Sequence, residues 1–486
     1  MKDMKKTNRL TAMILAMAMG AALASCGEKK EEANGDIPTL KWYLPGTAQS
    51  DQETVNVKIN EILEKEAGCH LDIEYLDAGV YQEKMQMLMA SRDTYDLCFT
   101  GYVNNYQNAA QKGGLLKLDD YLDKYPGIKQ TVPQYALDAA RVDGSIYAIP
   151  NLQIMATATG LVIQKDLFDE FGQTKIEDVH GIEDIEPFMD WVVKNHPEKY
   201  AAKAALYGWN KKFDYKLLSE VTRGVDIIEK DGKIYAAKAP TLEMKKYLAQ
   251  KNSEYFEKGY FRQDIAVVTD TSADEKANKY ACWVAVYKPG MEEEVKASKN
   301  IDVYGVKVSN STLYPGTGRT TMTGVGKNSK YPEKAVRVIE LMNTNKELYN
   351  LVCFGIEGTH YKMTDAKHIE KIENSGYDPG MAWRFGNQFN ALLLPGQDDD
   401  VWEQTEKFNN EAEVSPIIDF TFDNMKVRTE IAQIETVYGK YTAFQYGFLP
   451  LEDYYDTFMA ELDKAGVQKV IDEVNRQLEE YFSKNK

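Results

Sequence analysis

Aromatic, amide and guanidinium side chains recur beside strand-like stretches of this sequence. They are Trp42, Tyr43, Tyr102, Asn104, Trp209, Asn210, Trp283, Arg319, Trp383, Arg384 and Asn387. A flat indole or phenol face can pack against ring C–H groups, while the polar groups can hydrogen-bond hydroxyls. This combination is typical of a site that binds a sugar, and we expect ligand binding by these residues.

Each tryptophan has a second interpretation, which is packing in the core. Trp42 and Trp283 lie in apolar runs, so a core position is as good an interpretation as ligand contact. Trp209 in "LYGWN" and Trp383 in "WRFGNQF" have polar neighbours, which favours exposure. Arg319 lies in a glycine-rich stretch, from which it could reach a ligand or serve only a turn.

Motifs for other chemistries are missing or incomplete in the sequence. "YPGTGRTTMTGVG" has no Lys before Ser or Thr, as a phosphate-binding loop requires, and Thr321 stands where a dinucleotide-binding loop needs its third glycine. The five histidines form no HExxH motif and no Cys/His cluster, and "QDDD" lacks calcium-loop spacing. We therefore expect no metal and no cofactor.

An enzymatic function is not expected either. The sequence contains no GxSxG motif and no Cys–His signature of a nucleophilic enzyme. A glycoside hydrolase needs only two carboxylates across a cleft, and with 75 acidic residues such a pair stays an open alternative. The expectation is a binding protein.

The first 26 residues have the pattern of an export signal. Lys2, Lys5, Lys6 and Arg9 precede an apolar stretch from Leu10 to Ala24, which is shorter than the roughly 20 residues of a spanning helix. "LASC" at 23–26 then resembles a bacterial lipobox. That resemblance implies cleavage after residue 25, a lipid on Cys26 that anchors the body outside the cell, and a solvated tether over 26–36. An ordinary secretory signal is the alternative.

Length and composition indicate a large two-domain protein. The chain has 486 residues, 43% of them hydrophobic, and a formal net charge of -17. That charge argues against nucleic acid or an anionic lipid surface as partner of the folded body. Apart from Cys26, the four cysteines are far apart, so buried free thiols are expected. A Cys69–Cys98 bridge stays open.

Strand-like and helix-like patterns alternate along the body. "HLDIEYL" at 70–76 alternates apolar and polar residues, as a strand does. Val55, Ile59 and Leu63 recur at helical spacing, and the closing residues 467–481 form a strongly amphipathic helix. The alternation predicts an α/β layered fold, in which ligands bind beyond the carboxyl ends of strands.

The order of these stretches resembles a known family. "LKWYLPG", "YDLCFTG", "DGSIYAIP", "GLVIQKDLFDEFG" and "GVGKNSKYPEKAVRVIELMN" are similar to segments of bacterial extracellular solute-binding proteins, family 1, of ABC importers. "GIEGTHY", "WRFGNQF" and "SPIIDFTFD" are similar to a lipoprotein subgroup with a C-terminal domain of uncharacterised function.

The resemblance implies a periplasmic-binding-protein-like fold: two α/β lobes joined by a hinge, and a helical C-terminal region. It places lobe 1 at 37–160 plus 320–360 and lobe 2 at 161–319 plus 361–486. The chain would cross between the lobes near Gly160–Lys165 and Met322–Gly326.

The function that the resemblance implies is capture of a sugar or oligosaccharide for import. The protein would be a monomer, and its closed form would dock on the membrane subunits of an ABC permease. A peptide receptor is the first alternative, and a surface sensor or glycan-processing enzyme on the same fold the second.

Overall fold

The computed structural model describes residues 37–91, 93–268, 270–445, 447–448 and 451–484. The chain divides after Ile37, and Pro38–Lys486 forms one compact unit. The predicted signal peptide over 1–25, Cys26 and the tether to residue 36 lie outside the described residues. Within the described part, no helix has the length and apolar character needed to cross a membrane.

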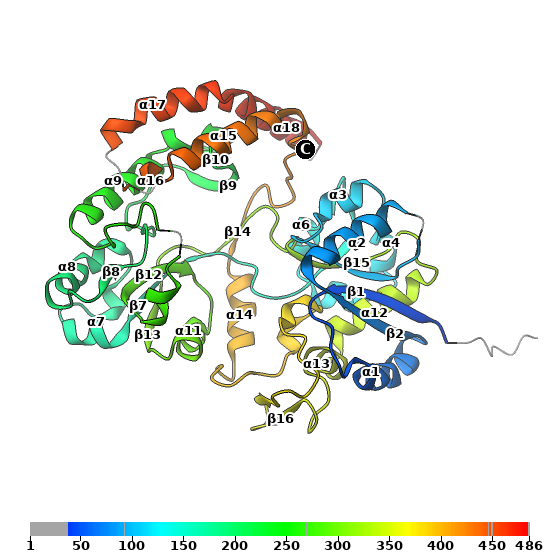
Figure 1. Ribbon diagram of the computed structural model, residues 1–486. Helices are drawn as coiled ribbons and strands as arrows, with labels where there is room; N and C mark the ends of the chain where they lie inside the picture. Colours follow the sequence, from blue (N-terminus) through cyan, green and yellow to red (C-terminus); the bar gives the residue numbers. More distant parts are fainter. Residues whose placement is uncertain (1–36, 92, 269, 446, 449–450, 485–486) are drawn as a thin grey trace, which may run out of the picture. The chain divides into compact units, whose positions relative to one another are not determined.

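A five-stranded sheet forms the first lobe (Figure 1). Its order is β2-β1-β3-β15-β6, with bounds His70–Leu76, Thr39–Pro45, Leu97–Gly101, Thr321–Val325 and Ala148–Pro150. β1 is parallel to β2 and β3, whereas β15 is antiparallel to β3 and β6. The carboxyl ends of β1, β3 and β6 therefore meet the start of β15 at one edge, which we call the carboxyl edge.

The apolar residues of the strand and the helix that the sequence predicts here are buried in this lobe. Leu71, Ile73 and Tyr75 of β2 are buried, and their polar neighbours are half-exposed, which confirms the predicted strand. Val55, Ile59 and Leu63 form the buried stripe of α1, as predicted. The main helices of this lobe are α1 (Gln52–Glu66), α2 (Ala78–Ala90), α12 (Pro332–Thr344) and α13 (Lys346–Phe354).

A four-stranded sheet forms the second lobe. Its order is β13-β7-β12-β8, with bounds Val303–Lys307, Thr159–Gln164, Tyr280–Val286 and Tyr200–Ala202. The helices α7 (Lys165–Phe171), α8 (Glu186–Asn195), α9 (Glu243–Glu257) and α11 (Met291–Lys299) accompany it. Apolar side chains such as Ile163, Phe188 and Cys282 form its separate core. The α/β two-lobe expectation is thus confirmed.

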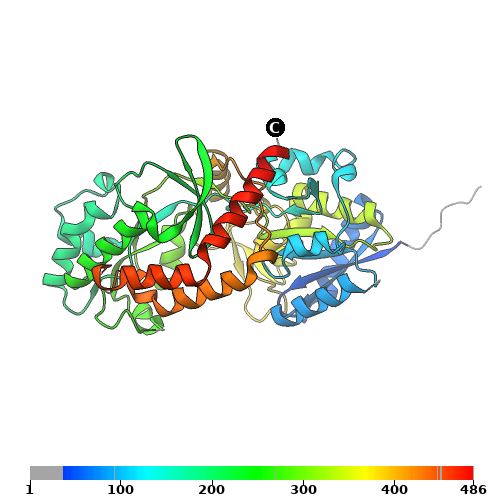
Figure 2. The ribbon, with the colours of Figure 1, turned by 90° about the horizontal axis from the view of Figure 1, so that it is seen from above.

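The C-terminal helices share a third core with a strand meander from the middle of the chain. The meander is β9 (Lys216–Thr222), β10 (Val225–Lys230) and β11 (Lys233–Lys238), and the helices are α15 (Arg428–Lys440), α17 (Leu451–Lys464) and α18 (Val467–Lys484). Val225 and Ile227 pack with Val470 and Val474 in this core. Figure 2 shows α18, in red, lying along the meander, in green, and the Ala236 N–H donates to Asn475 Oδ1 at 2.8 Å. We call this unit the C-terminal module.

Three connecting segments pair with one another between the two sheets. Thr157 pairs with Thr312, and β14 (Thr312–Leu313) pairs with β18 (Glu413–Val414). The predicted crossings near Gly160–Lys165 and Met322–Gly326 instead coincide with β7 and β15, each inside a sheet. The paired connections lie a few residues before these strands.

Residues 361–412 share little with the core of the second sheet, although the Phe408 ring lies 5.6 Å from that of Tyr287 and 5.8 Å from Lys307 Nζ of β13. Their buried side chains, including Tyr361, Phe385 and Phe408, belong to the core of the first sheet. After Ile417 most buried side chains belong to the C-terminal module, whereas Phe448 packs in the core of the second sheet. The predicted partition of the chain into two lobes stays a prediction, and these packing contacts favour moving 361–412 from lobe 2 to lobe 1.

Shorter elements complete the described structure. They are α3 (Tyr106–Gln111), α4 (Asp119–Leu122), α5 (Pro126–Thr131), α6 (Gln134–Ala139), β4 (Arg141–Val142), β5 (Ser145–Ile146), α10 (Ser272–Lys276), β16 (Tyr361–Met363), β17 (Ile369–Lys371), α14 (Val401–Asn410) and α16 (Thr442–Gln445). Cys69, Cys98, Cys282 and Cys353 are buried free thiols, so the structure contains no Cys69–Cys98 bridge. Burial raises the pKa of the Cys98 and Cys282 thiols to about 12, which keeps them protonated and inert.

Candidate functional site

The carboxyl edge brings chain segments together closely enough to require a glycine. The Tyr102 N–H donates to the Thr320 carbonyl at 2.9 Å, which joins the end of β3 to the approach of β15. A Cβ atom at Gly101 would lie 2.1 Å from that carbonyl oxygen, and Gly101 has a φ of +132°. Only glycine fits there. The turn sets Tyr102 at the edge.

Two predicted aromatic residues meet at this edge. The rings of Tyr102 and Trp383 are 6.3 Å apart. Phe99 lies under both, 5.9 Å from Tyr102 and 6.3 Å from Trp383. Tyr102 is 63% exposed, whereas Trp383 is half-buried and Phe99 is fully buried. The buried ring supports two partly exposed rings, an arrangement that offers apolar faces to a ligand.

Arg384 lies next to Trp383 in the chain but is oriented into the protein. It is 4% exposed and donates to the carbonyl oxygens of Pro45, Pro379 and Gly380. Burial lowers the pKa of its guanidinium. Because its donors are used on the last residue of β1 and on Pro379 and Gly380, Arg384 ties these segments together at the carboxyl edge. Its ligand contact stays a prediction, which this pairing disfavours.

Arg319 has the same kind of role. Its guanidinium donates to the carbonyl oxygens of Ala139, Arg141 and Asp419 and to Thr421 Oγ1, with the Arg141 and Asp419 contacts at 3.0 and 2.9 Å. Burial lowers the pKa of Arg319 as well. It ties the segment before β15 to the start of the C-terminal module.

A cavity of about 320 Å³ adjoins the carboxyl edge. Asn151, Gln153, Thr320 and Thr321 are among its lining residues. Gln153 Nε2 donates to Thr321 Oγ1 at 2.6 Å, and Asn151 Nδ2 donates to the Arg384 carbonyl at 2.8 Å. Our sequence analysis missed these polar residues. Their signal was an Asn and a Gln directly after the apolar run "AIP", where a strand ends.

Four predicted site residues of the first lobe make contacts within the fold. Trp42 is 1% exposed and packs edge-on against Phe385 at 6.3 Å, and Tyr43 is 6% exposed. Asn104 is buried and accepts a hydrogen bond from Thr100, and Asn387 caps its own turn through the Phe389 N–H at 3.0 Å. Their ligand contact stays a prediction, which the burial of Trp42, Tyr43 and Asn104 disfavours.

The predicted residues of the second lobe lie apart from the aromatic pair. Trp209 is half-buried beside Tyr247, with ring centroids 5.5 Å apart. Asn210 is exposed and contacts Glu183 and Asp184. Trp283 packs with the small core of Val162, Met291 and Val303, with Lys299 Nζ 5.5 Å from the ring centroid. Trp283 thus packs against the α11 side of its sheet, whereas Trp209 keeps partial exposure.

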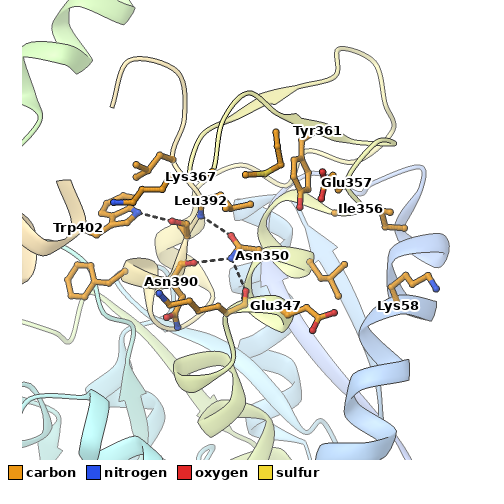
Figure 3. Close-up of a pocket in the computed structure, with 18 of the residues that line it drawn as sticks. Lys58, Glu347, Asn350, Ile356, Glu357, Tyr361, Lys367, Asn390, Leu392 and Trp402 are labelled. Carbon is orange, nitrogen blue, oxygen red and sulfur yellow. Dashed lines mark hydrogen bonds between the residues drawn. The ribbon is translucent and has the colours of Figure 1, made fainter. Parts of the chain in front are cut away.

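A larger cavity of about 720 Å³ lies between α1, α13 and the 356–403 segment (Figure 3). Asn350 is one of its lining residues. The Asn350 carboxamide is hydrogen-bonded to backbone groups of Lys346, Asn390 and Leu392. Trp402 also lines it and donates to the Ala391 carbonyl at 2.9 Å. None of the predicted site residues lines this cavity. Among the described residues, no group of three His, Cys, Asp or Glu side chains could hold a metal ion.

Comparison with known proteins agrees with this architecture. Residues 416–483 match the family model of a domain of unknown function, DUF3502. A protein of Streptococcus pneumoniae serotype 4 described as a carbohydrate ABC transporter substrate-binding protein is 27% identical over all of both chains. YtcQ of Bacillus subtilis, described as a polygalacturonan/rhamnogalacturonan-binding protein, is 21% identical and covers 76% of this chain and 77% of its own.

Among solved structures, the N-glycan transport solute binding protein NgtS of Streptococcus pneumoniae has the same fold. It superposes with a TM-score of 0.78 at 23% identity, over 92% of this chain and 100% of its own. NgtS in complex with Man1GlcNAc and Man5GlcNAc superposes at 0.65 and 0.61. The chain therefore shares the fold of extracellular solute-binding proteins, and its residues 416–483 match DUF3502.

Proposed function

We propose that this protein is the extracytoplasmic substrate-binding component of an ABC importer, and that it captures a sugar or oligosaccharide at the carboxyl edge. The observation that carries the proposal is the pair of exposed Tyr102 and half-buried Trp383 at the carboxyl edge. Ring faces of this kind pack against sugar C–H groups, and Gln153 and Thr320 offer nearby hydrogen-bonding groups.

The charges at the carboxyl edge favour a sugar over a peptide. A peptide receptor needs a charge for a chain terminus or an edge for backbone pairing. Arg319 and Arg384 are the two cations predicted for this site, and both are consumed by backbone carbonyls. The relatives described as carbohydrate-binding support the same choice.

Ligand capture is proposed to work by closure of the lobes around the connecting segments. A ligand that touches both lobes only in one arrangement shifts the population toward it. The TM-score of this chain is 0.78 to one NgtS structure and 0.65 and 0.61 to NgtS in complex with Man1GlcNAc and Man5GlcNAc. Trp209, with its partial exposure, is the second-lobe residue proposed to contact the ligand, and the closed form would dock on the permease as a monomer.

A ligand screen tests this function. The protein is titrated with monosaccharides, oligosaccharides and short peptides while its Tm is followed. A ligand at about a hundred times its Kd stabilises the native state by about 2.7 kcal/mol, which for a chain of this size is a rise of several degrees. We expect a rise with an oligosaccharide that is recovered unchanged. A response to peptides alone contradicts the proposal, and consumption of the saccharide would favour the glycan-processing enzyme.

A further inference from the structure

The three connecting segments form a small hydrogen-bonded ladder. Thr157 and Thr312 exchange two backbone hydrogen bonds, both 2.9 Å long. The Glu413 N–H donates to the Ser311 carbonyl at 2.9 Å, and the Ser415 N–H donates to the Leu313 carbonyl at 3.0 Å. Because these segments join the first sheet to the second and to the C-terminal module, any rotation between those parts acts on this ladder.

Asn409 holds the start of this ladder from one side. It lies at the end of α14, four residues before β18, and is 3% exposed. Its Oδ1 accepts from the N–H groups of Met155 and Ala156 at 2.8 and 3.0 Å. Its Nδ2 donates to the Gln153 carbonyl at 2.7 Å. One buried carboxamide thus fixes the backbone of 153–156, which leads into the first connection.

The clamp also reaches the entrance to β15. The side chain of Gln153 donates to Thr321 Oγ1 at 2.6 Å, and Thr321 is the first residue of that strand. Asn409 precedes β18, Gln153 precedes Thr157, and Thr321 follows β14. The hydrogen bonds among these residues therefore link the three connecting segments to one another. All three segments are held together on the first-lobe side of the ladder.

We propose that Asn409 is a positioning residue for ligand capture, which sets the geometry about which the connecting segments move. Without its carboxamide, the three segments would leave the first lobe independently, and the unliganded protein would sample more arrangements. A receptor whose binding-competent arrangement is less populated binds its ligand more weakly. The expected effect on affinity rests on the proposed function, whereas the expected effect on the unliganded protein is independent of it.

Asn350 provides a matched control (Figure 3). Its carboxamide also makes three backbone hydrogen bonds, two donated to the Lys346 and Asn390 carbonyls at 2.8 and 2.9 Å and one accepted from the Leu392 N–H at 2.9 Å. These bonds join α13 to a loop within the first lobe, away from the connecting segments. Loss of this carboxamide should cost stability in the same way without loosening the ladder.

The test compares N409D with N350D. Each replacement keeps the side-chain shape: N409D loses the one donated hydrogen bond, to the Gln153 carbonyl, and N350D loses two, to the Lys346 and Asn390 carbonyls. Each also sets a carboxylate oxygen against a backbone carbonyl. Spin labels on cysteines introduced at Val57 in the first lobe and at Val267 in the second report the distance between the lobes; these side chains are 59% and 78% exposed, and the native cysteines of the described residues are buried. The labelled protein is Pro38–Lys486, the compact unit, which lacks Cys26.

We expect N409D to broaden the distance distribution of the unliganded protein and to raise the Kd of the oligosaccharide found in the ligand screen. The Kd should rise up to about tenfold, as expected when one ordinary hydrogen bond is lost. N350D should lower Tm to a similar degree and change neither readout. Equal broadening in both variants, or none in N409D, overturns the inference.

The two proposals can fail separately. If the wild-type protein binds no saccharide, the proposed function fails, and the distance distributions still decide the role of Asn409. If N409D does not fold, N409S and N350S replace the two variants, because serine removes most of the carboxamide without adding a charge.

Discussion

Trp383 is the residue on which the proposed site depends most. Its ring lies 6.3 Å from that of Tyr102 at the carboxyl edge. We expect Trp383→Ala to weaken saccharide binding roughly 10- to 100-fold, as for a central aromatic contact. Isothermal titration with the oligosaccharide from the ligand screen measures this loss.

Trp402→Ala is the control for that prediction. Trp402 is also half-buried, but it lines the larger cavity of Figure 3 instead of the carboxyl edge. Its loss should leave the saccharide Kd unchanged. If Trp402→Ala weakens binding and Trp383→Ala does not, the ligand occupies the larger cavity and the proposed site is wrong.

Arg384 should respond to substitution as a positioning group. Its guanidinium donates to four backbone carbonyls, an arrangement that the single ammonium of lysine does not reproduce. We expect Arg384→Lys to reduce the free energy of unfolding by about 2 kcal/mol, because buried carbonyls lose donors. Urea denaturation measures it. An unchanged unfolding midpoint would show that Arg384 is not needed to tie the end of β1 to Pro379 and Gly380.

At the scale of elements, β10 carries a buried carboxyl group that makes the C-terminal module sensitive to pH. Asp226 is 1% exposed, Lys245 Nζ is 3.8 Å from it, and burial raises the pKa of Asp226 to about 7. An unfolded aspartate titrates near pH 4. The stability that this group contributes is therefore fully present below about pH 4 and is lost as the pH rises through about 7.

Asp226→Asn should remove that loss. We expect Tm of the variant to match the wild type near pH 4 and to exceed it increasingly toward pH 8, by roughly 1 °C per kcal/mol recovered for a folded unit of this size. Thermal unfolding from pH 4 to 8 measures the difference. A constant difference across this range would mean that Asp226 does not titrate within it.

The helices that match the domain of unknown function pack against strands from much earlier in the chain. The matched residues 416–483 bury Val470 and Val474 against Val225 and Ile227, which belong to strands far earlier in the chain. A peptide of 416–486 alone lacks that apolar partner, so we expect it to unfold without a cooperative transition by circular dichroism. Adding residues 214–242 in trans should restore helicity. A cooperative transition in the isolated peptide would show that the helices form a domain by themselves.

At the scale of the whole molecule, the lipid predicted on Cys26 would anchor the binding body to the membrane that holds the proposed permease. Cys26 ends the lipobox-like "LASC", and the folded unit begins at Pro38. We expect Cys26→Ser to abolish incorporation of labelled fatty acid and to release the protein from the membrane fraction. Saccharide affinity should be unchanged, because the substitution lies outside the compact unit. Retention of the variant on the membrane would point to an uncleaved signal segment.

The sequence by itself determined the features that depend on local patterns. The strand at 70–76 was predicted correctly from its alternation, and the helix of Val55, Ile59 and Leu63 from its spacing. The closing helix was predicted correctly as well, and it buries Val467, Val470, Ile471, Val474 and Leu478. A segment whose apolar residues repeat at the period of a strand or helix needs one buried face wherever it packs. The ordered motifs also indicated the family and its fold.

Only the tertiary structure decided which candidate side chains face solvent. Trp42 and Trp383 are the same residue type, yet Phe385 covers one and the other lies beside exposed Tyr102. Arg319 and Arg384 resembled ligand contacts until their carbonyl partners, up to 339 residues away in sequence, were placed around them. The pairing of Thr157, Thr312 and Glu413 could not be predicted from the sequence either. Contacts between distant segments produce no periodic pattern in the sequence of either segment.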